Sequence, residues 1–162
     1  VMTRLLVIHH SPTPGVRALT DAVLAGAGDD ALTGVEVVSR PALEATAADV
    51  LSAEGIVLGT PANFGYMSGA LKHFFDTIFL EAGGALSDRG AATTLRGGRK
   101  PYALYVHGRY DTAGAVRSVL TIVQALPWRQ AADVLDVVGE ITPGDRAAAY
   151  ELGGTIAALL SP

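Results

Sequence analysis

The sequence predicts an α/β domain in which a doubly wound parallel sheet of five strands is covered by helices on both faces. Five short apolar runs alternate along the chain with amphipathic helical segments. Continuous apolar runs are typical of strands buried on both faces, and strands separated by helices require crossovers that leave them parallel. Because 162 residues are a one-domain length, we expect a single domain over residues 1–162.

The expected strands are short, and the second and fifth contain a charged residue, which favours places near the sheet edges. The five runs are Leu5–Ile8, Val35–Val38, Ile56–Leu58, Tyr102–Val106 and Val134–Val138.

Helical periodicity fills the intervals between these runs. Apolar residues repeat at helical spacing over Val16–Leu24, Met67–Ile78, Val116–Val123 and Leu152–Leu160, and more weakly over Leu43–Leu51. Thr142 followed by Pro143, with an acid at Asp145, predicts a capped helix start. The glycine-rich stretch from Gly83 to Lys100 is the one long irregular segment. It is expected to cover a ligand, contact a second subunit or be a tolerated surface insertion.

Composition excludes several classes of function. Apolar residues make up 49 % and charged residues 17 %, and the net charge is −4 without a basic stripe, so we expect no nucleic-acid partner. The absence of cysteine excludes disulfides and zinc–thiolate sites. No stretch has the length and apolarity of a membrane span, and the first residues do not form a secretory signal, so we expect a cytoplasmic protein with no membrane partner.

A metal site is not expected either. His9 and His10 are neighbours at the end of the first strand, and adjacent strand residues point to opposite faces. They cannot bind one ion from a regular strand, and no acidic cluster lies near them in the sequence.

A motif after the third expected strand carries the strongest functional signal. It runs from Gly59 to Asp76, reads GTPANFGYMSGALKHFFD, and passes directly from a strand into an amphipathic helix. It resembles the flavin-binding loop and following helix of the flavodoxin-like NAD(P)H-dependent FMN reductases and quinone reductases. The resemblance implies a flavodoxin-like fold with strand order 2-1-3-4-5, and FMN as cofactor. It assigns to the isoalloxazine edge Pro61, Ala62, Asn63, Phe64 and Gly65.

The loop after the first strand resembles the phosphate loop of the same families. Hydroxyls and backbone amides at a helix N-terminus form an anion site. Ser11 and Thr13 match the hydroxyl positions, Gly15 and Val16 match the amide positions, and Arg17 would add a charge-assisted contact. Two prolines in the loop remove backbone donors, and the alternative is a proline-rich connector with an ordinary helix cap.

The loop after the fourth strand is where these families complete the flavin pocket. His107, Gly108 and Arg109 occupy that position, and Arg109 and the following Tyr110 depart from the small residues common there. The departure of interest for charge is Arg109. Its charge would favour a reduced, anionic flavin or meet the phosphates of a nicotinamide donor. The third alternative is a plain surface arginine.

The resemblance implies an oxidoreductase that passes hydride from NADPH or NADH through FMN to a quinone, a flavin or a similar small acceptor. The cofactor supplies this chemistry, so no side chain is assigned as catalytic. The alternatives are a flavodoxin-type one-electron carrier and a flavin-binding module without catalysis. A signalling receiver would need an aspartate where Gly59 stands and acids where His9 and His10 stand. The resembling families also imply a homodimer or homotetramer.

Overall fold

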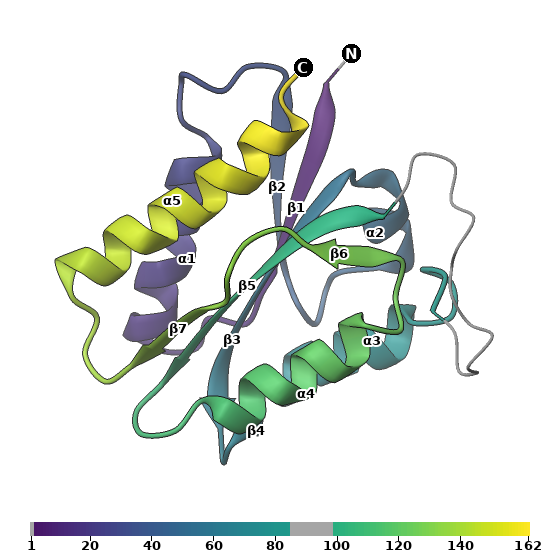
Figure 1. Cartoon of the computed structure of the whole chain (residues 1–162). Coiled ribbons are helices and arrows are strands. Elements are labelled where there is room, and N and C mark those ends of the chain that lie inside the picture. Colours follow the sequence, from purple (N-terminus) through teal and green to yellow (C-terminus); the bar gives the residue numbers. More distant parts are fainter. Residues whose placement is uncertain (1, 85–98) are drawn as a thin grey trace.

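The computed structural model describes residues 2–84 and 99–162, which form one parallel sheet between two helical layers (Figure 1). The strands are β1 (Thr3–His9), β2 (Val35–Pro41), β3 (Gly55–Asn63), β4 (Tyr66–Met67), β5 (Lys100–Gly108), β6 (Trp128–Gln130) and β7 (Leu135–Val138). The helices are α1 (Pro14–Ala27), α2 (Ala47–Ser52), α3 (Gly69–Ile78), α4 (Ala113–Val123) and α5 (Pro143–Leu160). Of the predicted irregular stretch Gly83–Lys100, residues 85–98 lie outside this description.

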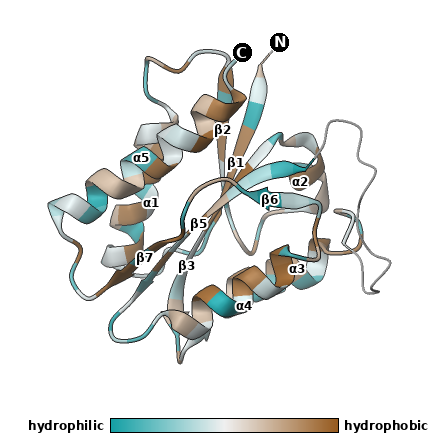
Figure 2. Cartoon of the chain, in the orientation of Figure 1, coloured by the Kyte–Doolittle hydropathy of each residue, from teal (hydrophilic) through white to brown (hydrophobic). Residues whose placement is uncertain are grey.

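The strand order β2-β1-β3-β5-β6 confirms the predicted doubly wound topology, with β1, β2, β3 and β5 all parallel. Alternate side chains of the central strands enter two separate cores. Leu5 and Val7 pack with α1 and α5, whereas Leu6 and Ile8 pack with α2, α3 and α4. In Figure 2 hydrophobic and hydrophilic residues alternate along each of the helices that cover the sheet, as expected for helices with one buried face. This burial on both faces explains why the strands read as continuous apolar runs.

The sheet has seven strands instead of the predicted five. The fifth predicted run, Val134–Val138, is confirmed as β7, which pairs with the last residues of β5. β6 was not predicted, and it pairs with the first residues of β5. The segment 131–134 between them lies outside both strands. Trp128–Gln130 contains an arginine and a glutamine, so it shows no apolar run that a sequence pattern could detect. The seventh strand is the short β4, which pairs antiparallel with β3.

Helices α1 and α5 pack against each other closely enough to require a residue without a side chain. A Cβ atom on Gly153 would lie 2.0 Å from the carbonyl oxygen of Val23, which is far below any van der Waals contact. The predicted cap of α5 is confirmed, because Thr142 and Asp145 form a reciprocal capping box. The start of α5 is thereby fixed at the same end of the sheet as the start of α1 (Figure 1).

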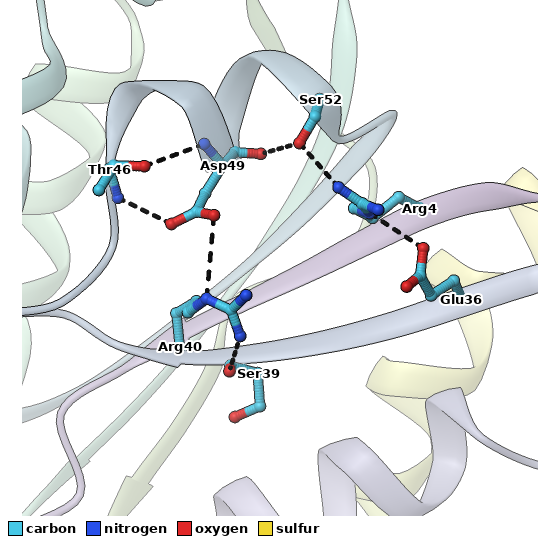
Figure 3. A network of polar contacts seen from close by, with 7 residues as sticks. All are labelled: Arg4, Glu36, Ser39, Arg40, Thr46, Asp49 and Ser52. Atoms are coloured by element: carbon cyan, nitrogen blue, oxygen red, sulfur yellow. Dashed lines mark hydrogen bonds and ion pairs between the residues drawn. The ribbon is translucent and has the colours of Figure 1, made fainter.

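A polar network fixes α2 against the outer strands (Figure 3). Arg4 forms an ion pair with Glu36 at 3.0 Å and donates to the Ser52 hydroxyl at 3.0 Å, while Arg40 and Asp49 are 3.8 Å apart. These side chains are partly exposed, so each pair contributes little to stability. Their effect is to hold α2 over β1 and β2, away from the loops that follow β3 and β5.

Within the two described ranges, no helix is long and apolar enough to cross a membrane.

Candidate functional site

The carboxyl ends of β1, β3, β5 and β7 lie at one edge of the sheet because the strands are parallel. In open α/β sheets, ligands bind beyond the carboxyl ends of the strands. They bind at the point where the strand order reverses, so that the connections from two neighbouring strands lead to opposite faces of the sheet. Here the reversal falls between β1 and β3. All three predicted loops begin at this edge, so the fold brings the predicted residues to one end of the molecule.

The motif after β3 forms a tight hairpin. Pro61, Ala62 and Asn63 belong to β3, where a loop was expected, and Asn63 pairs with Tyr66. Phe64 and Gly65 form the two-residue turn with φ angles of 51° and 75°. Positive φ at both positions is the signature of a type I′ turn, which suits Gly65 and strains Phe64.

The expected helix starts later than its apolar pattern indicated. Met67 lies in β4 and α3 begins at Gly69, after the Ser68 side chain accepts a hydrogen bond from the Leu71 amide at 3.2 Å. Met67 is nevertheless buried in the same core as the helix, which is why it fitted the periodicity.

The hairpin is fixed to its surroundings at both ends. Thr60 is buried, and its hydroxyl accepts from the Ser68 amide at 2.9 Å and donates to the Pro61 carbonyl at 2.8 Å. The Met67 amide donates to the Ser118 hydroxyl of α4 at 3.4 Å. The turn therefore rests on α4 and presents a fixed conformation at the edge.

Three aromatic side chains are exposed at this edge. Phe64 is fully exposed, Tyr110 is 84 % exposed on the segment after β5, and Tyr66 is 44 % exposed on β4. Exposed aromatic groups that gather at one place are typical of ligand or partner sites. The strained backbone at Phe64 also indicates a functional site, because such strain is found mostly at these sites. Of these three, the sequence assigned only Phe64 to the flavin contacts, and it marked Tyr110 as a departure from the small residues expected after the fourth strand.

The loop after β1 holds its polar groups in local contacts. The Thr13 hydroxyl caps α1 by accepting from the Val16 amide at 3.4 Å. Arg17 is exposed and its guanidinium donates to the Ser11 carbonyl at 3.4 Å. No described group accepts a hydrogen bond from the Gly15 amide, so this first-turn donor faces the edge unpaired. The proposed phosphate roles of these residues stay predictions.

The Ser11 hydroxyl belongs to a chain of hydrogen bonds that enters the core. It lies 2.8 Å from Nδ1 of His9 and 2.8 Å from the Thr20 hydroxyl, which lies 2.6 Å from the hydroxyl of Tyr105. At the other end, Nε2 of His9 is 3.1 Å from the Ser39 hydroxyl.

Burial raises the pKa of Tyr105, so its phenol keeps its proton, and Thr20 is its hydrogen-bond partner. Every hydroxyl in this chain of hydrogen bonds can donate or accept. With the phenol as donor, Thr20 can donate to Ser11, and Ser11 can donate to Nδ1 of His9. In this arrangement the Ser11 hydroxyl donates its hydrogen to His9.

The same chain requires a neutral His9. Burial lowers the pKa of His9, the neighbouring His10 lowers it further, and Asp21 opposes the shift. A neutral ring accepts at Nδ1 and donates from Nε2, which matches its contacts to Ser11 and Ser39.

The residues predicted after β5 lie around a cavity between α1 and α5. His107 and Gly108 are the last residues of β5, where a loop was expected, and Arg109 follows them. Nε2 of His107 donates to the Gly139 carbonyl at 2.6 Å, and a Cβ on Gly15 would lie 2.4 Å from the His107 ring. The cavity has a volume of about 580 Å³. It is lined by Pro14, Gly15, Ala18, His107, Arg109, Gly139, Glu140, Ile141 and Arg146.

Sequence reasoning missed the contribution of the segment before α5. Glu140 and Arg146 were not among the predicted site residues, although they follow β7 at the same edge. The signal was present, because residues that follow any parallel strand share this edge. In the part of the chain that the structure describes, no group of histidines and acids could hold a metal ion, and His9 and His10 are no exception.

Comparison with known proteins identifies the family. The family described as NADPH-dependent FMN reductase matches residues 9–138, from the last residue of β1 through the end of β7. The chain belongs to this family. A curated relative named Flavodoxin, from Aquifex aeolicus (strain VF5), is 34 % identical over 88 residues. That match covers 54 % of this chain and less than half, 46 %, of the relative.

Solved structures show the same fold as this FMN reductase family member. Oxidised Flavodoxin 1 from Bacillus cereus superposes with a TM-score of 0.77 and 15 % identity, over 98 % of this chain and 100 % of that one. The flavodiiron core of Flv1 from Synechocystis sp. PCC6803 gives a TM-score of 0.75 and 15 % identity. In that case 98 % of this chain matches only 36 % of the larger protein.

Proposed function

We propose that the carboxyl edge of the sheet binds FMN and that the protein is an NAD(P)H-dependent reductase of small acceptors. The observation that carries this proposal is the pair of exposed aromatic side chains, Phe64 and Tyr110, on neighbouring segments of that edge. A flat aromatic ring system between them would cover apolar surface that is otherwise left in water. The described residues fit the rest of the cofactor as well.

Each part of the edge would hold a different part of FMN. The unpaired Gly15 amide and the guanidinium of Arg17 would bind the phosphate, as the sequence predicts for this loop. The backbone of Asn63 and Gly65 would approach the ring edge, where a fixed hairpin offers polar groups without a large side chain between them. Bound there, FMN would accept hydride from NADPH or NADH and deliver electrons to a quinone, a flavin or a similar acceptor.

The Gly15 environment sets the shape of this site. Because the His107 ring occupies the space beside Gly15, α1 can begin close to β5 only without a side chain at this position. His107 is in turn held by the Gly139 carbonyl. The chain thereby orients the edge before any ligand arrives, which lowers the entropic cost of binding.

A one-electron carrier is the competing function, and the relative named Flavodoxin supports it. The charges at the edge favour a reductase. Arg17, Arg109 and Arg146 line two cavities at this end of the sheet, and the acids in the same linings are Asp21 and Glu140. The balance of these side chains is positive, which attracts an anionic dinucleotide. Carriers that dock on basic partners need the opposite charge around the flavin.

Titration of free FMN fluorescence with the purified protein tests cofactor binding. We expect saturable quenching at about micromolar affinity or tighter, which corresponds to roughly −8 kcal/mol or better. Absence of quenching would contradict FMN binding and leave a different ligand for this edge.

Anaerobic addition of NADPH or NADH to the FMN-loaded protein then separates reductase from carrier. We expect the visible absorbance of the bound flavin to bleach within seconds with one of the two donors. Flavin that stays oxidised with both would favour the carrier.

We also propose that the chain acts as a homodimer or homotetramer in the cytoplasm. Leu80 is 68 % exposed beside a cavity lined by α3 and α4, which leaves apolar surface on that side. Light scattering at micromolar concentration tests this proposal, and a monomer would contradict it.

A further inference from the structure

The cavity between α1 and α5 contains two arginines that the proposed flavin contacts do not use. Arg109 comes from the end of β5 and Arg146 from the first turn of α5, and both are exposed. Among the residues that the structure describes, neither guanidinium takes part in an ion pair. Glu140 lines the same cavity, yet it forms no ion pair with either arginine.

Two like charges at one cavity repel each other unless an anion lies between them. Guanidinium groups bind phosphate through two parallel N–H donors, and this pairing is stronger than neutral hydrogen bonds. The arginines come from separate elements, so an anion bound between them would be contacted from two directions. The cavity walls are also preformed, because His107 joins β5 to the segment before α5 through the Gly139 carbonyl.

The size of the cavity indicates more than a single inorganic phosphate. Its volume of about 580 Å³ is in the range of pockets that hold a nucleotide-sized ligand. Pro14, Ala18 and Ile141 supply apolar wall beside the cations, which suits the base or sugar of a nucleotide.

We propose that this cavity binds the phosphate-bearing adenylate part of the nicotinamide dinucleotide, with Arg109 and Arg146 as the phosphate contacts. The proposal rests on the reductase function, because it supplies that reaction with its donor site. The cavity opens at the same edge as the proposed flavin contacts, and Gly15 lies on both. A dinucleotide anchored between α1 and α5 would therefore reach the flavin site from the side of β5 and β7.

Calorimetric titration of FMN-loaded protein with 2′,5′-ADP and with ADP tests the proposal without using activity. We expect at least one of them to bind, with affinity that falls as salt is added. Tighter binding of 2′,5′-ADP would place the 2′-phosphate at the arginines, and equal binding would place the diphosphate there. Either result supports the site, whereas no binding of both compounds would overturn it.

Arg146→Gln is the decisive variant, with Arg109→Gln as an independent second one. Each should weaken binding of the better fragment about fivefold or more, and should raise the KM for the dinucleotide by a similar factor. The affinity of Arg146→Gln for FMN should change less than about twofold. Arg117→Gln is the matched control, because Arg117 is an exposed arginine on α4 that does not line this cavity.

The outcomes separate this proposal from the proposed function. Equal weakening of FMN and fragment binding in Arg146→Gln would show that the cavity holds the flavin phosphate, and would overturn the dinucleotide assignment. Unchanged fragment binding in both variants would overturn it as well. Failure of the wild-type protein to bind FMN at all would instead contradict the proposed function. Circular dichroism of each variant confirms that the fold is retained.

Discussion

The hydroxyl groups of Tyr105 and Thr20 lie 2.6 Å apart, and both residues are buried beneath the loop that follows β1. Tyr105 comes from the centre of the sheet and Thr20 from α1, so this contact joins the core to the helix that starts at the candidate phosphate site. Through Thr20 it continues to Ser11, and through Ser11 to His9. A substitution of Tyr105 in the core should therefore alter the hydrogen bonds of the loop that follows β1.

Replacement of Tyr105 by phenylalanine should destabilise the protein by about 1–2 kcal/mol. The variant keeps the ring but removes its hydroxyl, and leaves the buried Thr20 hydroxyl with Ser11 as its remaining partner. Urea denaturation measures the change in the free energy of unfolding. Tyr102→Phe is the matched control, because Tyr102 is buried on β5 but its hydroxyl makes no hydrogen bond to a described residue. An equal loss of stability in Tyr105→Phe and Tyr102→Phe would show that the hydrogen-bond chain contributes nothing to stability.

The pH dependence of stability should report the neutral state of His9. Because the pKa of His9 is lowered in the folded state, the unfolded chain takes up a proton first as the pH falls. The stability that neutral His9 contributes is complete above the unfolded pKa of about 6.5. It is lost as the pH falls from there toward the lower pKa of the folded state.

Urea denaturation at about pH 7.5 and about pH 5.5, on either side of the ordinary histidine pKa, measures this effect. The wild-type protein should lose stability at the lower pH, and His9→Gln should lose clearly less. His73→Gln is the control, because His73 is exposed on α3 and its ring contacts only the Thr77 hydroxyl among the described residues. If His9→Gln and His73→Gln keep the full wild-type pH dependence, His9 is not the group responsible.

A side chain at Gly15 should disturb both α1 and β5. The Cβ of an alanine would lie 2.4 Å from the His107 ring, so the ring must move and lose its bond to the Gly139 carbonyl. Overpacking of this kind costs about 1–3 kcal/mol. Thermal unfolding should show a lower Tm and FMN should bind more weakly. Gly69→Ala is the control, because no atom lies within 4 Å of its added Cβ at the start of α3. A Gly15→Ala protein as stable as that control would contradict the proposed packing.

The sequence predicted a parallel sheet between two helical layers because burial on both faces leaves an apolar signal that needs no knowledge of contacts. The strand order came from the family resemblance, since periodicity carries no information on order. The sequence also placed the three loops at one edge, since that follows from parallel strands alone. It did not predict β6, because this strand is too short and polar to form a pattern. The hydrogen-bond chain from Tyr105 to His9 was equally out of reach, since its members are up to 96 positions apart and belong to different elements.

The turn at Phe64 and Gly65 escaped prediction for another reason. Asparagine and glycine dominate type I′ turns, and a phenylalanine at the first position argues against one. The motif resemblance led instead to a loop over Pro61–Gly65, of which three residues are strand.

The unfavourable phenylalanine at this turn predicts a substitution that raises stability and lowers FMN affinity. Phe64→Asn should raise the free energy of unfolding of the FMN-free protein by about 1 kcal/mol, because asparagine tolerates positive φ and an exposed phenylalanine contributes no burial. The same change should weaken FMN binding about three- to tenfold, which is what an aromatic pair of about 0.5–1.5 kcal/mol contributes. Denaturation of the FMN-free protein and FMN fluorescence titration measure the two effects separately.

Leu80→Asn is the control for this variant, because it also removes an exposed apolar side chain but lies beyond α3, outside the candidate site. It should leave FMN affinity unchanged. Unaltered FMN affinity in Phe64→Asn would show that the ring does not contact the cofactor, and the strain at the turn would then have no functional account. Weaker binding together with greater stability would show that the chain retains an unfavourable residue at this turn because the residue contacts the ligand.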